Sequence, residues 1–321
     1  MIVVTGCAGF IGWKTAFVLL ERGESILGID DMNDYYDPKI KEWRLSTLLD
    51  KKNFEFQRLD ISRYEPLKEI LDRKGIDSII NLAARAGVRA SVENPWVYLD
   101  ANMKGTLNLL EICKDRSIKK FVLASTSSVY GLEEMPFSED IKTDKPLAQY
   151  PATKKGAEVL CYSYHYLYSI DISIPRYFTV YGPAGRPDMS IFQFIKRIDE
   201  GMPIKIFGDG KQKRDFTYID DIVEGTILGL KPLGYEIFNL GNNNSIELSY
   251  VIGLIEEFLG KKAKIEYLPR HPADVPATWA DIKKAKELLG WEPKVKIEEG
   301  IERTGRWYIE NRGWLKGIRI E

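Results

Sequence analysis

TGCAGFIG, residues 5–12, follows a short apolar run at the start of the chain and opens a segment with helical apolar periodicity. Its glycines, Gly6, Gly9 and Gly12, allow a tight turn and let a pyrophosphate approach the N-terminus of the next helix, whose free N–H groups and dipole favour an anion. Such a turn between a strand and a helix is typical of dinucleotide-binding folds, although glycines at this spacing also occur in ordinary turns. The stretch therefore predicts an α/β fold that binds a dinucleotide.

Asp30 ends the next strand-like apolar run, where a carboxylate can accept hydrogen bonds from the adenosine ribose of the cofactor. A 2′-phosphate would meet Asp30 with like charge, and no arginine replaces Asp30, so NAD is favoured over NADP. The alternative is that Asp30 and Asp31 only cap the turn that follows. We predict NAD as the cofactor.

Short apolar runs alternate with helix-length segments through the first half of the chain. Strands that alternate with helices form parallel βαβ units with right-handed crossovers. We therefore predict an α/β fold built on a doubly wound parallel (Rossmann) sheet. The expected strands lie within residues 2–5, 24–30, 54–60, 77–83, 119–125 and 171–178.

The rhythm of the sequence changes at GPAGRPDM, residues 182–189, after which helical stretches alternate with short strand-like pieces. We expect residues 1–179 to form the NAD-binding domain, with residues 214–241 returning to it as one more helix and strand. Residues 180–213 and 242–321 are expected to form a smaller C-terminal α/β domain that binds the substrate.

Charge and cysteine content exclude several classes of protein. The 321 residues include 46 basic and 47 acidic ones, a formal net charge of −1, so the chain has no electrostatic footprint for nucleic acid or an anionic membrane. No apolar run approaches the ~20 residues that span a bilayer. Cys7, Cys113 and Cys161 lie far apart without metal-binding spacing, so we expect no metal site and no disulfide, and a reducing, cytoplasmic location.

A second pattern combines a cluster of hydroxyls with a tyrosine and a lysine. ASTSSVYG, residues 124–131, ends an apolar run with four Ser or Thr side chains. A Ser or Thr nucleophile needs a base, usually histidine, and neither of the two histidines of the chain is placed to help. YPATKK, residues 150–155, instead sets Tyr150 and Lys154 four residues apart, on one face of a helix.

Tyr150 can act as a base only if its pKa falls. A tyrosine of pKa about 10 must drop by ~3 units, on the order of 4 kcal/mol, to be a phenolate at neutral pH. Lys154 and a positively charged nicotinamide could together supply this stabilisation. Thr126 would hydrogen-bond the base and the reacting oxygen. The alternative is that Tyr150 only packs within an aromatic helix.

Together these motifs resemble the extended short-chain dehydrogenase/reductase family, and specifically its nucleotide-sugar members. The resemblance runs nearly the whole chain and includes NLAARAGVRAS (81–91), RYFTVYGP (176–183) and RDFTYIDDI (214–222). It implies an NAD-dependent enzyme whose substrate lies between two domains. The residues that it implies for the cofactor are Gly6, Gly9, Phe10, Ile11, Gly12, Asp30, Asp60, Ile61, Leu82, Ala83, Ala84, Asn102, Tyr150, Lys154 and Phe178.

Within that family the sequence is most similar to the UDP-glucuronate 4-epimerase group, for example in DDMNDYYDPKIK (30–41) and HPADVPATWADI (271–282). The resemblance implies that C4 of UDP-glucuronate is inverted, giving UDP-galacturonate, through a 4-keto intermediate. It implies Thr126, Tyr150 and Lys154 for catalysis, Ser128, Thr179 and Arg186 for the sugar carboxylate, and Arg214 with Asp274 for the uridine diphosphate.

The sequence departs from this group at four positions. The group usually has Trp where Ala184 stands, small residues or His where Trp13 and Lys14 stand, and often Gln where Arg85 stands. These changes leave the implied catalytic set intact.

Other functions remain open at this point. Ser127 and Ser128 stand where dehydratase and decarboxylase relatives carry an acid for a further proton transfer, which favours epimerisation. UDP-glucose 4-epimerase and UDP-glucuronate decarboxylase are the alternative enzymes, and an NAD-sensing or scaffold protein is the alternative outside enzymes. The amphipathic segments 94–115 and 147–169 are expected to pair across a two-fold axis, as in the family's dimers, so we predict a homodimer.

Overall fold

A large parallel sheet forms the centre of the computed structural model, which describes residues 1–72 and 75–320. Within these residues eight strands belong to it, in the order β11-β7-β5-β4-β1-β2-β3, with β6 paired to β7. The prediction of a doubly wound sheet is confirmed, because strand order reverses on either side of β1. The strands are β1 (Ile2–Thr5), β2 (Ile26–Asp30), β3 (Phe54–Arg58), β4 (Ser78–Asn81), β5 (Lys120–Leu123), β6 (Ser125–Thr126), β7 (Asp171–Tyr177) and β11 (Tyr235–Leu240).

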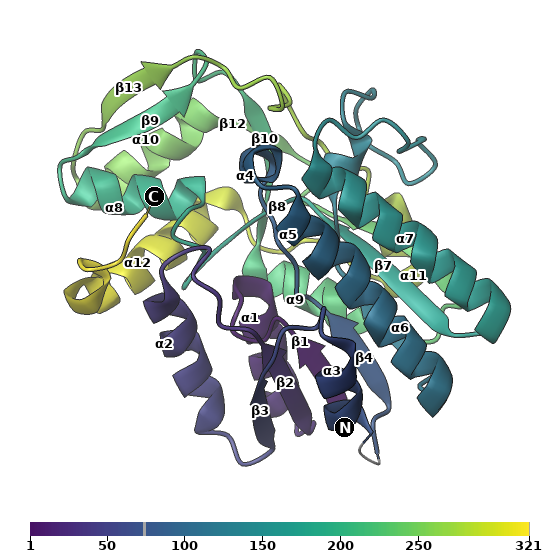
Figure 1. Cartoon of the computed structure of the whole chain (residues 1–321). Helices are drawn as coiled ribbons and strands as arrows, with labels where there is room; N and C mark the ends of the chain where they lie inside the picture. The colour runs from purple at the N-terminus through teal and green to yellow at the C-terminus, as the bar shows by residue number, and fades with distance from the viewer. Residues whose placement is uncertain (73–74, 321) are drawn as a thin grey trace.

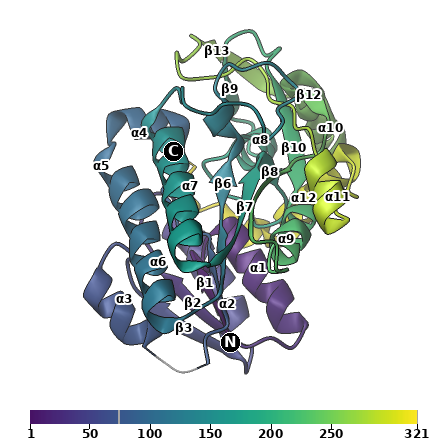
Figure 2. The same cartoon turned by 90° about the vertical axis from the view of Figure 1, so that its right-hand side faces the viewer.

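Helices cover both faces of this sheet. On one face lie α1 (Phe10–Glu21), α2 (Pro38–Leu49) and α9 (Ile219–Leu228); on the other lie α3 (Tyr64–Leu71), α6 (Gly105–Arg116) and α7 (Gln149–Tyr168). Figures 1 and 2 show α6 and α7 side by side, with α1 and α9 on the opposite side of the sheet. Strand β1 alternates accordingly, since Ile2 and Val4 face the first layer and Val3 faces the second.

A smaller α/β part lies above the carboxyl ends of the large sheet (Figure 1). Its strands form a three-stranded sheet, β12-β10-β8, and a parallel pair, β9 with β13. The predicted return of the chain to the large sheet places β11 beside β7 in parallel register. The boundaries of the two domains stay a prediction. The strands here are β8 (Thr179–Tyr181), β9 (Pro203–Phe207), β10 (Lys213–Tyr218), β12 (Ser245–Glu247) and β13 (Lys264–Leu268), and the helices are α8 (Ser190–Asp199), α10 (Leu248–Leu259), α11 (Lys283–Leu289) and α12 (Ile297–Leu315).

Four short helical segments pack against α7, and two of them, α4 and α5, are labelled beside it in Figure 2. They are α4 (Val88–Glu93), α5 (Trp96–Tyr98), the π-helical turn η1 (Leu99–Lys104) and the 3₁₀ turn η2 (Ser127–Tyr130). Among the helices of the described residues, none has the length and apolar character needed to cross a membrane.

The glycine-rich turn sits where the strand order reverses, between the ends of β1 and β4. Gly6 has a φ of +68°, and a Cβ at this residue would lie 2.7 Å from the backbone nitrogen of Ala83. A Cβ at Gly12 would lie 2.0 Å from the carbonyl oxygen of Gly6. Both positions therefore require glycine. The turn lies at the carboxyl edge of the sheet where the strand order reverses, which is where open α/β sheets bind their ligands.

Candidate active site

A cleft of about 660 Å³ opens at this edge, between the large sheet and the smaller part. Its volume lies in the range of small-molecule sites. The cleft brings together nearly all the predicted cofactor residues, which come from segments far apart in the sequence. The predicted cofactor residues that line it are Gly6, Gly9, Phe10, Ile11, Gly12, Asp30, Asp60, Ile61, Leu82, Ala83, Ala84, Tyr150, Lys154 and Phe178.

Asp30 is held at the end of β2 by the glycine-rich loop itself. Its carboxylate accepts hydrogen bonds from the N–H groups of Ala8 (3.1 Å) and Met32 (2.8 Å). The ammonium of Lys41 lies 3.7 Å from the same carboxylate. The carboxylate is thereby fixed beside the cleft with lone pairs left to accept further hydrogen bonds, as binding of ribose hydroxyls requires.

Asn102 is the one predicted cofactor residue that does not line the cleft. It is fully buried behind the wall, where its amide oxygen accepts from the N–H of Arg85 (2.9 Å) and its amide nitrogen donates to the carbonyl of Arg85 (3.1 Å). The same nitrogen donates to the hydroxyl of Thr153 on α7 (3.0 Å), which in turn donates to the carbonyl of Tyr150 (2.9 Å). Asn102 therefore connects the loop after β4 to the start of α7.

Thr126, Tyr150 and Lys154 all line the cleft. Thr126 begins the 3₁₀ turn η2 and accepts a hydrogen bond from the N–H of Ser128 (3.2 Å). Burial raises the pKa of Tyr150, and a hydrogen bond with Thr126 opposes this rise. Burial lowers the pKa of Lys154 to about 8, against a smaller opposing effect of Glu158. The chain alone thus keeps Tyr150 as a phenol, and a phenolate needs further positive charge in the cleft.

A buried ion pair lies behind Lys154. Glu158, one helical turn along α7, accepts hydrogen bonds from Nε and Nη2 of Arg176 on β7, at 2.9 and 2.8 Å. Ser125, next to Thr126, donates to the same carboxylate (2.6 Å). Nη1 of Arg176 donates to the hydroxyl of Tyr130 (3.0 Å). The pair thus joins the strand end that carries Thr126 to the helix that carries Tyr150 and Lys154.

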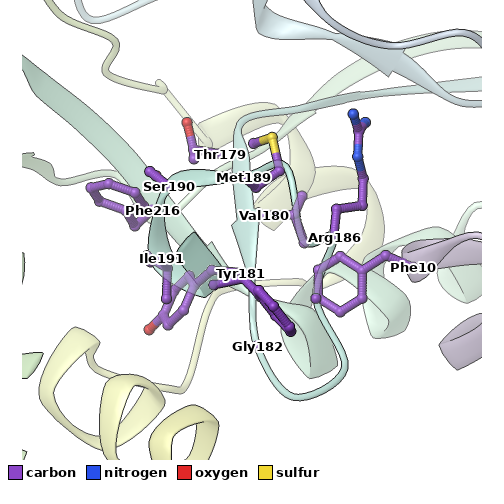
Figure 3. Close-up of a pocket in the computed structure, with 12 residues that line it drawn as sticks. Phe10, Thr179, Val180, Tyr181, Gly182, Arg186, Met189, Ser190, Ile191 and Phe216 are labelled. Carbon is purple, nitrogen blue, oxygen red and sulfur yellow. The ribbon is translucent and has the colours of Figure 1, made fainter. Parts of the chain in front are cut away.

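Ser128, Thr179 and Arg186, predicted to contact the sugar carboxylate, all line the cleft. Arg186 projects from the loop of residues 182–189, beside the ring of Phe10 (Figure 3). It is already paired: Nε donates to Asp188 (3.0 Å), and Nη2 donates to Asp188 (2.5 Å) and to the carbonyl of Ala86 (3.3 Å).

The charge of Arg186 is secured by this pairing. Burial acts against the charged form, but Asp188 more than offsets it, so the pKa of Arg186 is raised. The guanidinium also stacks against Tyr35 and Tyr36, with its central carbon 5.5 and 5.6 Å from the ring centroids. These contacts use Nε and Nη2, so Nη1 is the nitrogen left to meet a ligand.

Arg214 and Asp274, predicted to contact the uridine diphosphate, line the cleft and lie near Arg89, which lines it too. Asp274 accepts hydrogen bonds from Nε and Nη2 of Arg89, at 3.1 and 2.5 Å. Arg214 donates to the carbonyl of Lys213 (2.8 Å). Burial lowers the pKa of Arg214, which Asp274 opposes. Two guanidiniums and one carboxylate therefore leave this end of the cleft positive.

The four positions that depart from the resembled group have different environments. Arg85 lines the cleft and donates to the side-chain oxygen of Asn33 (3.0 Å). Ala184 is buried with a φ of +56°. Trp13 and Lys14 lie on α1 and are not among the cleft residues: Trp13 donates to Thr47 on α2 (2.8 Å), and Lys14 lies 3.1 Å from Asp220 on α9.

Sequence reasoning missed several charged residues around the site. Glu158 could have been noticed because it stands four residues after Lys154, on the same helix face. Arg176 interrupts an apolar strand, where a buried charge requires a partner. Arg44 and Arg89 gave no local signal. Among the described residues no cluster of three or more His, Cys, Asp or Glu side chains could hold a metal ion.

Known proteins resemble this chain over nearly its whole length. The family model for GDP-mannose 4,6 dehydratase matches residues 3–304. The chain is 60% identical over 319 residues to a UDP-glucuronate 4-epimerase of Thermodesulfobacterium geofontis, covering 99% of each protein. It superposes with a TM-score of 0.91 on the crystal structure of a Bacillus cereus UDP-glucuronic acid 4-epimerase in complex with UDP-glucuronic acid and NAD, at 38% identity over 97% of this chain and 99% of that one.

A neutral-sugar relative is also similar. The UDP-glucose 4-epimerase of Thermotoga maritima, crystallised with UDP-glucose, has a TM-score of 0.89 at 30% identity, over 97% of this chain and 99% of that one. The fold is therefore common to relatives named for a charged and for a neutral sugar.

Proposed function

The chain belongs to the GDP-mannose 4,6-dehydratase family of extended short-chain dehydrogenases/reductases, and from this premise we infer that it is an NAD-dependent enzyme that inverts C4 of UDP-glucuronate to give UDP-galacturonate. The observation that carries the substrate is the 60% identity, over 99% of the chain, to a UDP-glucuronate 4-epimerase. We prefer UDP-glucuronate to UDP-glucose as the substrate because the UDP-glucose 4-epimerase is only 30% identical to this chain.

Tyr150 is the acid–base group in this proposal. It would take the proton of the C4 hydroxyl as the 4-keto intermediate forms and return it after the sugar has turned over. Thr126 supports this role because its hydroxyl hydrogen-bonds Tyr150 and counteracts the rise in pKa that burial causes. Lys154, with a pKa of about 8, is still mostly protonated at pH 7 and adds positive charge to the same wall.

Bound NAD would accept the hydride from C4, return it to the other face of the sugar, and add a positive charge near Tyr150. The residues present fit this cofactor: two glycines of the phosphate loop leave no room for a Cβ, and Asp30 is fixed at the end of β2. The reaction is redox-neutral, so NAD is expected to stay bound between turnovers.

The substrate would bind with its diphosphate at one end of the cleft and its sugar at the other. Arg89 and Arg214 supply positive charge for the diphosphate, and Asp274 orients Arg89 through two hydrogen bonds. Ser128, Thr179 and Nη1 of Arg186 are proposed to meet the sugar carboxylate, the group that distinguishes glucuronate from glucose.

The deciding experiment uses purified protein and a panel of UDP-sugars without added cofactor. UDP-glucuronate should be converted to UDP-galacturonate, and denatured protein should release NAD and no NADP. Conversion of UDP-glucose at a higher kcat/KM would instead make the neutral-sugar epimerase the better assignment. Release of carbon dioxide with a UDP-pentose product would indicate the decarboxylase.

We also propose that the chain forms a homodimer through the outer faces of α6 and α7. These adjacent helices and the segment before them carry large exposed apolar side chains, which isolated proteins seldom leave uncovered. Light scattering at micromolar concentration should give twice the chain mass, and a monomer mass would contradict the proposal. The exposed residues are Trp96, Leu99, Leu107, Val159, Tyr162 and Tyr166.

A cytoplasmic location is part of the same proposal. Cys7, Cys113 and Cys161 are all free and buried, as is usual for a protein that works under reducing conditions. Activity that is unchanged by millimolar reductant would agree with this location.

A further inference from the structure

Arg44, in the middle of α2, is a fully buried guanidinium that forms no ion pair among the described residues, although the charge of Asp30 attracts it. Burial lowers its pKa, because the charged form loses its hydration. Within the described residues it takes part in no ion pair, and its five hydrogen bonds all end on neutral oxygens. An unpaired buried cation is unfavourable for folding, so its presence points to a specific task.

The five hydrogen bonds join three segments that are distant in the sequence. Nη1 donates to the carbonyl of Ala8 in the glycine-rich loop (3.1 Å) and to the hydroxyl of Tyr36 (2.9 Å). Nε and Nη2 donate to the carbonyl of Ala184 (3.0 and 2.7 Å), and Nη2 donates also to that of Gly185 (3.1 Å). Arg44 is not among the residues that line the cleft. It therefore ties the cofactor loop to the loop that carries Arg186, from behind the wall.

Within the described residues, the carbonyls of Ala184 and Gly185 accept hydrogen bonds from Arg44 and from no other group, whereas Arg186 supports the loop through Ala86, Tyr35 and Tyr36. Ala184 has a φ of +56°, a region that residues with side chains rarely adopt. A cavity of about 20 Å³, room for about one water molecule, is lined by this loop together with Phe10, β8 and the start of α8 (Figure 3). The hydrogen bonds from Arg44 to the carbonyls of Ala184 and Gly185 are therefore expected to matter for the position of the loop.

We propose that Arg44 is a positioning residue for sugar recognition: it fixes the 182–189 loop against the glycine-rich loop and so sets where Arg186 meets the sugar. The identity of the sugar rests on the function proposed above, whereas the anchoring of the loop does not. A lysine keeps the charge but presents one nitrogen in place of the planar fork, so it cannot hold the carbonyls of Ala8, Ala184 and Gly185 together.

Amide hydrogen exchange on the NAD-loaded protein tests the anchoring. In Arg44→Lys the exchangeable amides of residues 184–189 should exchange at least tenfold faster than in the wild type, while those of α10 stay unchanged. Lys120→Met is the matched control: it removes another buried cation, bonded to Asp171 and Ser173 at the opposite end of the sheet, and should leave the loop unchanged. Unchanged exchange of the loop in Arg44→Lys would overturn the proposal.

A measurement on the wild type covers the case in which Arg44→Lys does not fold. An anchored loop should exchange clearly more slowly than the turn of residues 208–212. Exchange of residues 184–189 at the rate of that turn would contradict the anchoring without any variant.

Binding to the NAD-loaded protein tests the link to the sugar. By calorimetry, Arg44→Lys should weaken UDP-glucuronate about tenfold and UDP, which lacks the sugar, less than twofold. Equal weakening of both would overturn a positioning role and indicate general loosening. A wild type that binds UDP-glucose as tightly as UDP-glucuronate would contradict the proposed function instead, and the exchange result would still decide the anchoring.

Discussion

Glu158 and Arg176 form a two-point ion pair in the interior of the protein, with side chains only 1% exposed. Burial alone would raise the pKa of Glu158, but the hydrogen bonds and charge of Arg176 lower it, so both partners are charged. Each charge of such a pair is compensated only by the other, so removal of either side chain strongly destabilises the folded state. The position of the pair, between the strand end with Thr126 and the helix with Lys154, links the stability of the fold to the geometry of catalysis.

Replacement of Glu158 by Gln should therefore affect both stability and pH dependence. Loss of the carboxylate leaves Arg176 buried without a partner, which is expected to lower the free energy of unfolding by about 3–5 kcal/mol. Glu158 also raises the pKa of Lys154, so its removal should move that pKa below about 8. The alkaline limb of the kcat profile should then shift to lower pH.

Lys155→Gln is the control for this variant. Lys155 also contacts Glu158, at 3.2 Å, but from the partly exposed side, so its loss should change stability by less than about 1 kcal/mol. An unshifted pH profile in Glu158→Gln would show that Glu158 does not act on Lys154.

Lys154→Met should make the cofactor-free protein more stable while abolishing turnover. Burial holds the pKa of Lys154 near 8, below the usual 10.5, so the folded state binds this proton less tightly than the unfolded state. This weaker proton binding lowers the free energy of unfolding of the wild type by roughly 3 kcal/mol below pH 8. Lys154 therefore does not destabilise the folded state above pH 10.5, where it is neutral in both states. Its destabilising effect grows as the pH falls from 10.5 towards 8.

Denaturant unfolding at pH 7 and pH 10.5 would check this prediction. The variant should be more stable than the wild type at pH 7, and the difference should disappear at pH 10.5. A variant that is less stable at pH 7 would mean that Lys154 is stabilised by contacts that outweigh its desolvation.

The large sheet was predictable because each strand and the glycine-rich turn are local signals. The alternation of apolar runs was enough to predict a doubly wound sheet, although not the order of its strands, and Gly6 and Gly12 mark positions where only glycine fits. Most of the cleft residues were named only because the sequence resembles the family, and the convergence of parallel strand ends at one edge explains why they lie together. The roles of those residues in binding and catalysis remain predictions.

Specific side-chain contacts could not be predicted from the sequence, whether the partner is near or far along the chain. Asn102 was named for the cofactor, and its hydrogen bonds that connect Arg85 to α7 were not foreseen. The pairing of Arg186 with Asp188, two residues away, was not foreseen, because either side chain could equally have faced solvent. Arg44 binds carbonyls 140 and 141 residues away, for which no spacing rule exists.

Tyr150→Phe should separate binding from chemistry. The ring, with its edge contact to Tyr98 at 6.1 Å between centroids, is retained, so UDP-glucuronate should bind with nearly the wild-type Kd. Without the ionisable oxygen, kcat should fall by about 10²–10⁴. The wild type should gain activity as the pH rises through the acid limb, because burial raises the pKa of Tyr150 and the phenolate is the active form.

Calorimetry and a progress curve from the same preparation would measure both quantities. Tyr162→Phe, on the exposed outer face of α7, is the control and should keep full activity. Turnover of Tyr150→Phe within threefold of the wild type would remove Tyr150 from the mechanism.

Arg186→Met tests how the sugar is chosen. A charge-assisted hydrogen bond from Nη1 to the sugar carboxylate contributes ~1.5–3 kcal/mol, which corresponds to roughly a ten- to hundredfold preference for glucuronate over glucose. The variant should lose that much kcat/KM on UDP-glucuronate and much less on UDP-glucose. Arg116→Met, which removes an exposed arginine paired with Asp72 far from the cleft, is the control and should change neither value.

The ion pair with Asp188 offers a second explanation that the same assay can separate. Loss of Arg186 leaves the carboxylate of Asp188 uncompensated at 28% exposure, and that charge could itself repel glucuronate. In the double variant Arg186→Met with Asp188→Asn this repulsion is absent. If Arg186 binds the substrate directly, kcat/KM on UDP-glucuronate should stay at least tenfold below the wild type in the double variant. Recovery to the wild-type value would mean that Arg186 only neutralises Asp188, and equal losses on both sugars would mean that it holds the loop or the diphosphate.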